Sequence, residues 1–177
     1  MRKAWAAVLL GGLAAGTLDI LYAFLVYGPL SYGVTPLQVL QSVAAGWMGR
    51  EAARAGGVES AALGLATHFM IATIMAGVFV ALAARIRTLT RRALLCGFLY
   101  GLVLYAVMNY VVVPLSSAGA GGHFPTDWGD AVERLQRSFS RVKTDDAYPW
   151  MIWGTIFTHT VLVAMPVALI AKHFQRD

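Results

Sequence analysis

The chain alternates between four long apolar runs and shorter segments that carry most of its charge. The apolar runs cover about residues 4–27, 60–84, 93–113 and 150–171. Each is long enough to cross a bilayer, which takes about 20 apolar residues in a helix. Because a helix satisfies its own backbone hydrogen bonds in lipid, the pattern predicts four transmembrane helices.

Two of the polar segments also carry apolar residues at helical spacing. Residues 36–54 begin at a helix-start signal, Thr35-Pro36, with Pro36 as the first helical residue. Residues 127–142 begin with acids and end with bases, which suits the helix dipole. Such segments are typical of amphipathic helices at a membrane surface. We therefore predict an all-α fold, a four-helix transmembrane bundle with two additional amphipathic helices on the outer side, in a single integral membrane domain over residues 1–177.

Composition supports the membrane class, since 58% of the residues are hydrophobic and only 13% are charged. Soluble domains carry about 25% charged residues. The net charge of +5 would favour nucleic acid as a partner of a soluble protein, but here many bases flank the predicted spans. We expect the lipid bilayer as a partner and no nucleic acid. The single cysteine, Cys96, cannot form an internal disulfide, and we interpret it as a small apolar residue.

The distribution of lysine and arginine predicts the orientation of the spans. The N-terminus, the loop 85–92 and the C-terminus together hold eight of these bases, and the loop holds no acid. The other side holds six, mixed with acids in longer segments. The positive-inside rule then places both termini in the cytoplasm and both amphipathic helices outside. The first run follows a basic start as a signal peptide does, but it continues without a convincing cleavage site, so we expect a retained anchor.

Each span contains one conspicuous polar residue: Asp19, His68, Asn109 and His159. A carboxylate near the middle of a membrane helix costs about 2.5–3.5 kcal/mol, so it normally faces protein or water and has a partner. In the predicted orientation these residues fall within a layer roughly 5–8 Å deep in the outer half of the bilayer. We expect Asp19 to face inward beside His68 or His159. The candidate binding residues of this polar layer are Asp19, Tyr22, His68, Tyr105, Asn109, Thr155 and His159.

Three interpretations of the polar layer remain open. In the first, the side chains hydrogen-bond across helices and fix the packing. In the second, Asp19 and a histidine form a titrating pair that carries protons or a small solute. In the third, His68 and His159 are the axial ligands of a b-type haem. The third span also contains Gly97-x-x-x-Gly101, a close-packing motif of low specificity.

Signatures of enzymes are missing from the sequence. It contains no P-loop, dinucleotide fingerprint, zinc-ligand spacing or G-x-S-x-G nucleophile motif. We therefore name no catalytic residue and predict no cofactor apart from the haem alternative. The sequence favours a protein without enzymatic activity, and an enzyme stays the open alternative.

Four stretches of the chain carry a family resemblance: GTLDILYAFL, LQSVAAGWMGR, LGLATHFMIA and YGLVLYAVMNYVVVPLS. Together they resemble a family of small uncharacterised bacterial inner-membrane proteins with four predicted spans. The resemblance covers roughly residues 10–117, with a weaker echo around His159 and Pro166, and the 118–149 insert departs from it. The resemblance implies that the protein lies in the bacterial inner membrane and crosses it four times. It implies no activity. The leading hypothesis is a structural or interaction component whose partner is a second copy or another membrane protein.

Overall fold

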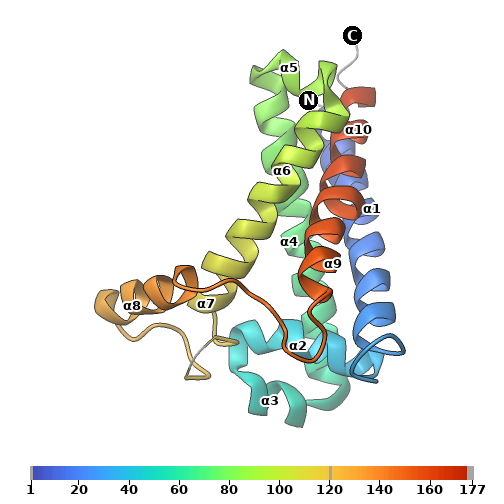
Figure 1. The fold of residues 1–177 in the computed structure, drawn as a ribbon. Coiled ribbons are helices and arrows are strands. Elements are labelled where there is room, and N and C mark those ends of the chain that lie inside the picture. The colour runs from blue at the N-terminus through green and yellow to red at the C-terminus, as the bar shows by residue number, and fades with distance from the viewer. Residues whose placement is uncertain (1, 120, 175–177) are drawn as a thin grey trace. The chain divides into compact units, whose positions relative to one another are not determined.

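Every regular element is a helix in the computed structural model, which describes residues 2–119 and 121–174 (Figure 1). No β-strand occurs within those two ranges, so the all-α fold class is confirmed. The α-helices are α1 (Arg2–Tyr27), α2 (Pro36–Met48), α3 (Arg50–Ala55), α4 (Gly57–Arg85), α5 (Arg87–Arg91), α6 (Ala93–Val107), α7 (Val113–Leu115), α8 (Trp128–Phe139), α9 (Met151–Phe157) and α10 (Met165–Phe174). Two π-helical segments are η1 (Met108–Val112) and η2 (Thr158–Ala164).

Four helical stretches are long and apolar enough to cross a membrane: Lys3–Tyr27, Gly57–Arg85, Ala93–Leu115 and Met151–Phe174. They confirm the four predicted runs in number and order, and each boundary lies within three residues of its prediction. Large apolar side chains such as Leu9, Leu13 and Leu21 are exposed along these stretches. This surface suits lipid tails, whereas a soluble protein rarely exposes so extensive an apolar area.

The chain forms two compact units. Unit 1 contains the described residues of Met1–Tyr22, His68–Tyr105 and Trp153–Asp177, and unit 2 contains Ala23–Thr67 and Ala106–Ile152. The single domain predicted from the sequence stays a prediction.

Small residues dominate the core of unit 1, where alanines and valines surround Phe79, a fully buried aromatic side chain. The two glycines of the Gly97-x-x-x-Gly101 motif face η2 and α10. A Cβ added at Gly97 would lie 3.0 Å from the Ala168 Cβ, and one added at Gly101 would lie 2.6 Å from the His159 carbonyl oxygen. The motif therefore serves close helix packing, as expected from its spacing.

The start of α1, helix α5 and the end of α10 lie at the same end of unit 1 (Figure 1). Leu89 of α5 and Phe174 of α10 both pack against the apolar core. The arginine-rich loop and both ends of the described chain thus lie at one end of this unit. This agrees with four candidate spans, because an even number of spans returns the chain to the side of the membrane on which it began.

In unit 2, α2 begins where the Thr35-Pro36 signal predicts. The Gln38 backbone N–H donates to Thr35 Oγ1 at 3.3 Å, and the Thr35 N–H donates to Gln38 Oε1 at 2.8 Å. This reciprocal pair is a capping box, which satisfies two otherwise unpaired backbone donors. The start of α4 packs closely on α2, because a Cβ added at Gly64 would lie 2.8 Å from the Leu40 carbonyl carbon.

The continuous helix predicted over residues 36–54 is wrong, because the chain breaks at Gly49 into α2 and α3. Gly49 has φ +80°, a conformation that side-chain-bearing residues rarely adopt. A Cβ there would also lie 3.4 Å from the Gly122 carbonyl carbon. The break carries Arg50 and Arg54 onto a separate short helix.

Helix α8 covers most of the segment predicted at residues 127–142. It begins with Asp127 as N-cap, whose side chain accepts from the Asp130 backbone N–H at 2.9 Å, and it ends at Phe139, three residues early. The Phe139 ring stacks on Tyr110 with centroids 5.4 Å apart. The following turn brings Lys143 to the same ring, with Nζ 5.7 Å from its centroid.

Both π-helical segments precede a proline: η1 comes before Pro114 and η2 before Pro166. Proline has no N–H, and its ring clashes with the carbonyl group four residues earlier in a regular α-helix. A wider helical turn relieves that clash. π-Helical turns are rare and frequently occur at functional sites, and here they contain Asn109 and His159.

Candidate functional site

Helices α1 and α4 approach closely in unit 1 because α1 presents glycines to α4. A Cβ added at Gly12 would lie 2.7 Å from the Thr73 Cα, and one at Gly16 would lie 3.3 Å from the Ala72 Cβ. The approach leaves the Gly16 carbonyl within reach of the α4 side chains. Small residues thus position the polar cluster that follows.

His68 lies against α1 at this close approach. Its Nε2 is 2.8 Å from the Gly16 carbonyl oxygen, and its Nδ1 is 3.9 Å from Asp19 Oδ2. The His68 side chain is 11% exposed and the Asp19 side chain 30%. Since a carbonyl oxygen can only accept, the hydrogen bond to Gly16 requires the proton on Nε2. With Nε2 bonded to Gly16, the ring turns Nδ1 toward the Asp19 carboxyl group.

Thr158, the first residue of η2, is the second partner of Asp19. Its hydroxyl donates to Asp19 Oδ1 at 2.8 Å, and the threonine is only 5% exposed. Asp19 thus connects α1 with α4 and η2 inside unit 1. The expectation that Asp19 lies near one of the two histidines is confirmed, with His68 as the neighbour.

His159 belongs to a neighbouring group. Its Nδ1 donates to the Thr155 carbonyl oxygen at 2.8 Å, and its ring meets Tyr105 edge-on with centroids 6.0 Å apart. Tyr22 packs against Phe157, also with centroids 6.0 Å apart. Six of the seven residues proposed for the polar layer therefore lie in unit 1, arranged as small groups. The seventh, Asn109, lies in η1 of unit 2.

Sequence reasoning places Thr158 near the polar layer but does not include it among the seven candidate binding residues, which contain Thr155 instead. Thr155 contributes its backbone carbonyl to His159, whereas Thr158 contributes the side chain that Asp19 needs. Pro166 is the sequence signal that could have revealed this, because a π-helical turn before it changes which side chains face α1.

The geometry of His68 does not favour a bis-histidine haem. An axial ligand must offer one free ring nitrogen to the iron, while the other is usually hydrogen-bonded. In His68, Nε2 is bonded to Gly16 and Nδ1 faces Asp19, so the ring would have to turn to bind iron. Among residues 2–119 and 121–174, no group of three or more His, Cys, Asp or Glu side chains could hold a metal ion.

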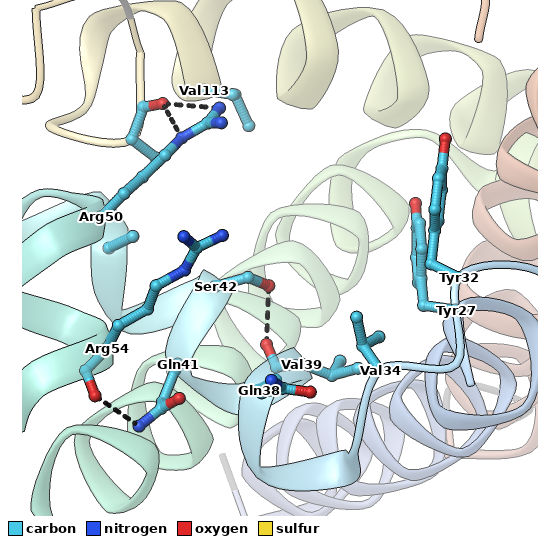
Figure 2. Close-up of a pocket in the computed structure, with 12 residues that line it drawn as sticks. Tyr27, Tyr32, Val34, Gln38, Val39, Gln41, Ser42, Arg50, Arg54 and Val113 are labelled. Carbon is cyan, nitrogen blue, oxygen red and sulfur yellow. Dashed lines mark hydrogen bonds between the residues drawn. The ribbon is translucent and has the colours of Figure 1, made fainter. Parts of the chain in front are cut away.

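Unit 2 contains a cavity of about 550 Å³ that the sequence analysis did not anticipate (Figure 2). Arg50 and Arg54 of α3 and Gln41 of α2 line it, together with Tyr27 and Tyr32. Gln41 is 5% exposed, and its Nε2 donates to the Gly57 carbonyl oxygen at 3.0 Å. The Gly49 break accounts for the missed site, because a continuous helix would place the arginines differently.

Four candidate spans and a polar cluster between apolar helices define a multi-pass α-helical membrane protein. Comparison of this chain with family models, curated proteins and solved structures found no match.

Proposed function

We propose that this protein is a structural or interaction component of a bacterial inner membrane, and that Asp19 holds three of its helices in register. The observation that carries the proposal is the pairing of Asp19 with Thr158 and His68. His68 also bonds the Gly16 carbonyl, and His159 bonds the Thr155 carbonyl. Polar groups satisfied within the protein favour a packing role, worth about 0.6 kcal/mol for an average interhelical hydrogen bond in a membrane.

The proposed topology has both termini in the cytoplasm and helices α2 and α8 at the outer surface. Exposed apolar side chains on α8, with Trp128 83% and Phe139 62% exposed, support contact of this helix with lipid. The family resemblance of residues 10–117 supports the bacterial inner membrane. In a Cys96→Ala background, we expect a membrane-impermeant maleimide to label Glu133→Cys in intact cells and Arg87→Cys only after lysis. The opposite pattern would contradict the orientation.

The partner we propose is a second copy of the chain or another membrane protein. Native mass measurement in lipid nanodiscs separates these cases, because only the first gives a defined multimer from purified protein. A monomer that also crosslinks to no neighbour in cells would argue against an interaction role.

Proton or small-solute transport is the second candidate. It is favoured by the position of His68 Nδ1, which points toward the Asp19 carboxyl group. His68 Nδ1 and Asp19 Oδ2 lie 3.9 Å apart, and a carboxylate oxygen and an imidazole nitrogen are both groups that can accept a proton. A site that holds one shared proton is what a relay requires.

Two variants of Asp19 distinguish the candidates. Asp19→Asn keeps an acceptor for Thr158 but cannot exchange a proton, whereas Asp19→Leu removes both properties. Under the structural proposal, Asp19→Asn keeps most of the thermal stability in detergent and Asp19→Leu loses it. Under the transport proposal, Asp19→Asn folds but abolishes proton flux into proteoliposomes that contain a pH-sensitive dye. Wild-type protein without flux, together with stable Asp19→Leu, would contradict both.

A further inference from the structure

The cavity of unit 2 lies where two candidate spans end. Tyr27 is the last residue of the span Lys3–Tyr27, and Val113 comes two residues before the end of Ala93–Leu115. Both residues line the cavity, and both belong to unit 2. Span ends mark the border between the hydrocarbon core and the headgroups. The cavity is therefore at the depth of lipid phosphates.

The charge of the lining is entirely positive. Arg50 and Arg54 contribute two guanidinium groups, and the described residues that line the cavity include no aspartate or glutamate. They are four positions apart on α3, which places them on the same helix face. Figure 2 shows the two side chains extending from α3 in the same direction. Two guanidiniums with this arrangement match an oxyanion, because each can offer paired N–H donors to phosphate oxygens.

The two arginines retain donors for a ligand. Arg50 donates from Nε and Nη2 to the Ala118 carbonyl oxygen at 3.3 and 3.2 Å, which orients the side chain and leaves Nη1 free for another acceptor. The Arg54 guanidinium has no hydrogen-bond or ion-pair partner in the part of the chain that the structure describes. Its backbone is held instead, since Gln41 Nε2 donates to the Arg54 carbonyl oxygen at 3.4 Å.

The remainder of the lining is largely apolar. Val34, Val39, Ala45 and Val113 contribute aliphatic surface, and Figure 2 shows Tyr27 and Tyr32 side by side across from the arginines. A volume of about 550 Å³ falls within the range of roughly 300–1,000 Å³ for ligand sites. One charged wall and one apolar wall suit an amphiphile better than a free inorganic anion.

We propose that this cavity binds the phosphate group of an anionic phospholipid, with Arg50 and Arg54 on the phosphate and the valines beside the glycerol and the first acyl carbons. The proposal does not depend on the role of Asp19, which belongs to unit 1. A net negative lipid is favoured over a zwitterionic one because the two guanidiniums face no acidic side chain in the lining.

The test is lipid binding by the purified full chain in a neutral maltoside detergent, followed by native mass spectrometry and thermal unfolding. The probes are phosphatidylglycerol, phosphatidylcholine and inorganic phosphate. We expect phosphatidylglycerol to bind and to raise the unfolding temperature more than either other probe. Arg54→Gln and Arg50→Gln should each weaken its binding roughly tenfold or more, as expected for the loss of one charge-assisted hydrogen bond.

Two controls keep the result interpretable. Arg91→Gln removes an exposed arginine from α5, outside the cavity, and should leave binding unchanged. Arg54→Lys retains the charge and should recover part of the affinity, which shows that loss in Arg54→Gln is not misfolding. Equal binding of phosphatidylglycerol and phosphatidylcholine, or unchanged binding in both Arg→Gln variants, would overturn the site. If inorganic phosphate raised the unfolding temperature as much as phosphatidylglycerol does, the proposal that the ligand is a lipid would be wrong.

Discussion

Thr158 and Asp19 are 139 positions apart in the chain, and a 2.8 Å hydrogen bond joins their side chains. The bond satisfies a carboxyl group that would otherwise be costly in the middle of an apolar helix. It also connects the first candidate span with the last. This polar pair therefore helps to fix the register of the two helices in unit 1, beside the apolar contacts between them.

Thr158→Val tests this dependence, since valine keeps the shape of threonine and removes the donor. We expect a loss of about 1 kcal/mol of stability, within the range for interhelical hydrogen bonds in membranes. Thermal unfolding in detergent, monitored by fluorescence-detected gel filtration, measures the change. Thr17→Val is the matched control, because Thr17 is an exposed threonine of α1. Equal stability of the two variants would show that the Thr158 hydroxyl is dispensable.

Gly101→Ala should destabilise the protein, because the new Cβ would lie 2.6 Å from the His159 carbonyl oxygen. Backbone cannot yield as a flexible side chain does, so we expect overpacking to cost about 1–3 kcal/mol. Gly77→Ala is the control within unit 1: its Cβ would meet only Val8 Cγ1, at an ordinary 3.7 Å. Thermal unfolding should separate the two variants clearly. A Gly101→Ala protein as stable as Gly77→Ala would refute the close contact with η2.

The contact between Tyr32 and Asp145 should make stability depend on pH at both extremes. The Tyr32 hydroxyl donates to the Asp145 carboxylate. This hydrogen bond is the main cause that raises the pKa of Tyr32 to about 12, and the same bond lowers the pKa of Asp145 below its ordinary value of 3.8. Tyr148 supports the contact, since its hydroxyl donates to the Ser31 carbonyl oxygen at 2.8 Å.

The direction of the effect follows from these two shifts. The lowered pKa of Asp145 contributes stability above pH 3.8 that is lost as the pH falls through its folded value. The raised pKa of Tyr32 contributes stability that is lost as the pH rises toward about 12. The difference in unfolding temperature between wild type and Tyr32→Phe should thus be constant near neutral pH and shrink in acid. Asp145→Asn keeps an acceptor for the Tyr32 hydroxyl but cannot titrate, so Tyr32→Phe in that background should change the unfolding temperature equally at neutral and acid pH. A wild-type difference that persists in acid would contradict the assignment.

Arg134 should hold the loop before α8 in place. The residue is 6% exposed, and its guanidinium donates to Asp130 Oδ1 at 2.8 Å and to the His123 carbonyl oxygen at 2.9 Å. Arg134→Met should increase amide hydrogen exchange over residues 123–130. It should also move the lowered pKa of Asp130 back up, because the hydrogen bond from Arg134 is the largest cause of that shift. Carbon-detected NMR titration of Asp130 measures the second effect.

Arg137→Met is the matched control for that change. Arg137 lies three positions after Arg134 on α8. Its side chain is 61% exposed and pairs with Glu133 in an exposed ion pair. Such pairs contribute little to stability. Unchanged exchange in both variants would show that the loop is held by other contacts.

The sequence alone determined the class of the protein. Apolar length and spacing predict the four spans, because a membrane helix must satisfy its backbone internally and cover about 30 Å of hydrocarbon. Thr35-Pro36 predicts the start of α2, since capping is a local interaction within one turn. The early acids of residues 127–142 place the start of α8 within one residue. The cost of a carboxylate in lipid likewise indicates that Asp19 has partners.

Only the tertiary structure decided which partners those are. The choice of Thr158 over Thr155 depends on a π-helical turn and on the close approach of helices at Gly16 and Gly101, neither of which a single helix specifies. The arginine-lined cavity likewise follows from a break at Gly49, where the φ of +80° and the backbone of Gly122 act together. Contacts between distant segments set these features, so local patterns could predict that Asp19 is paired but not the residue with which it pairs.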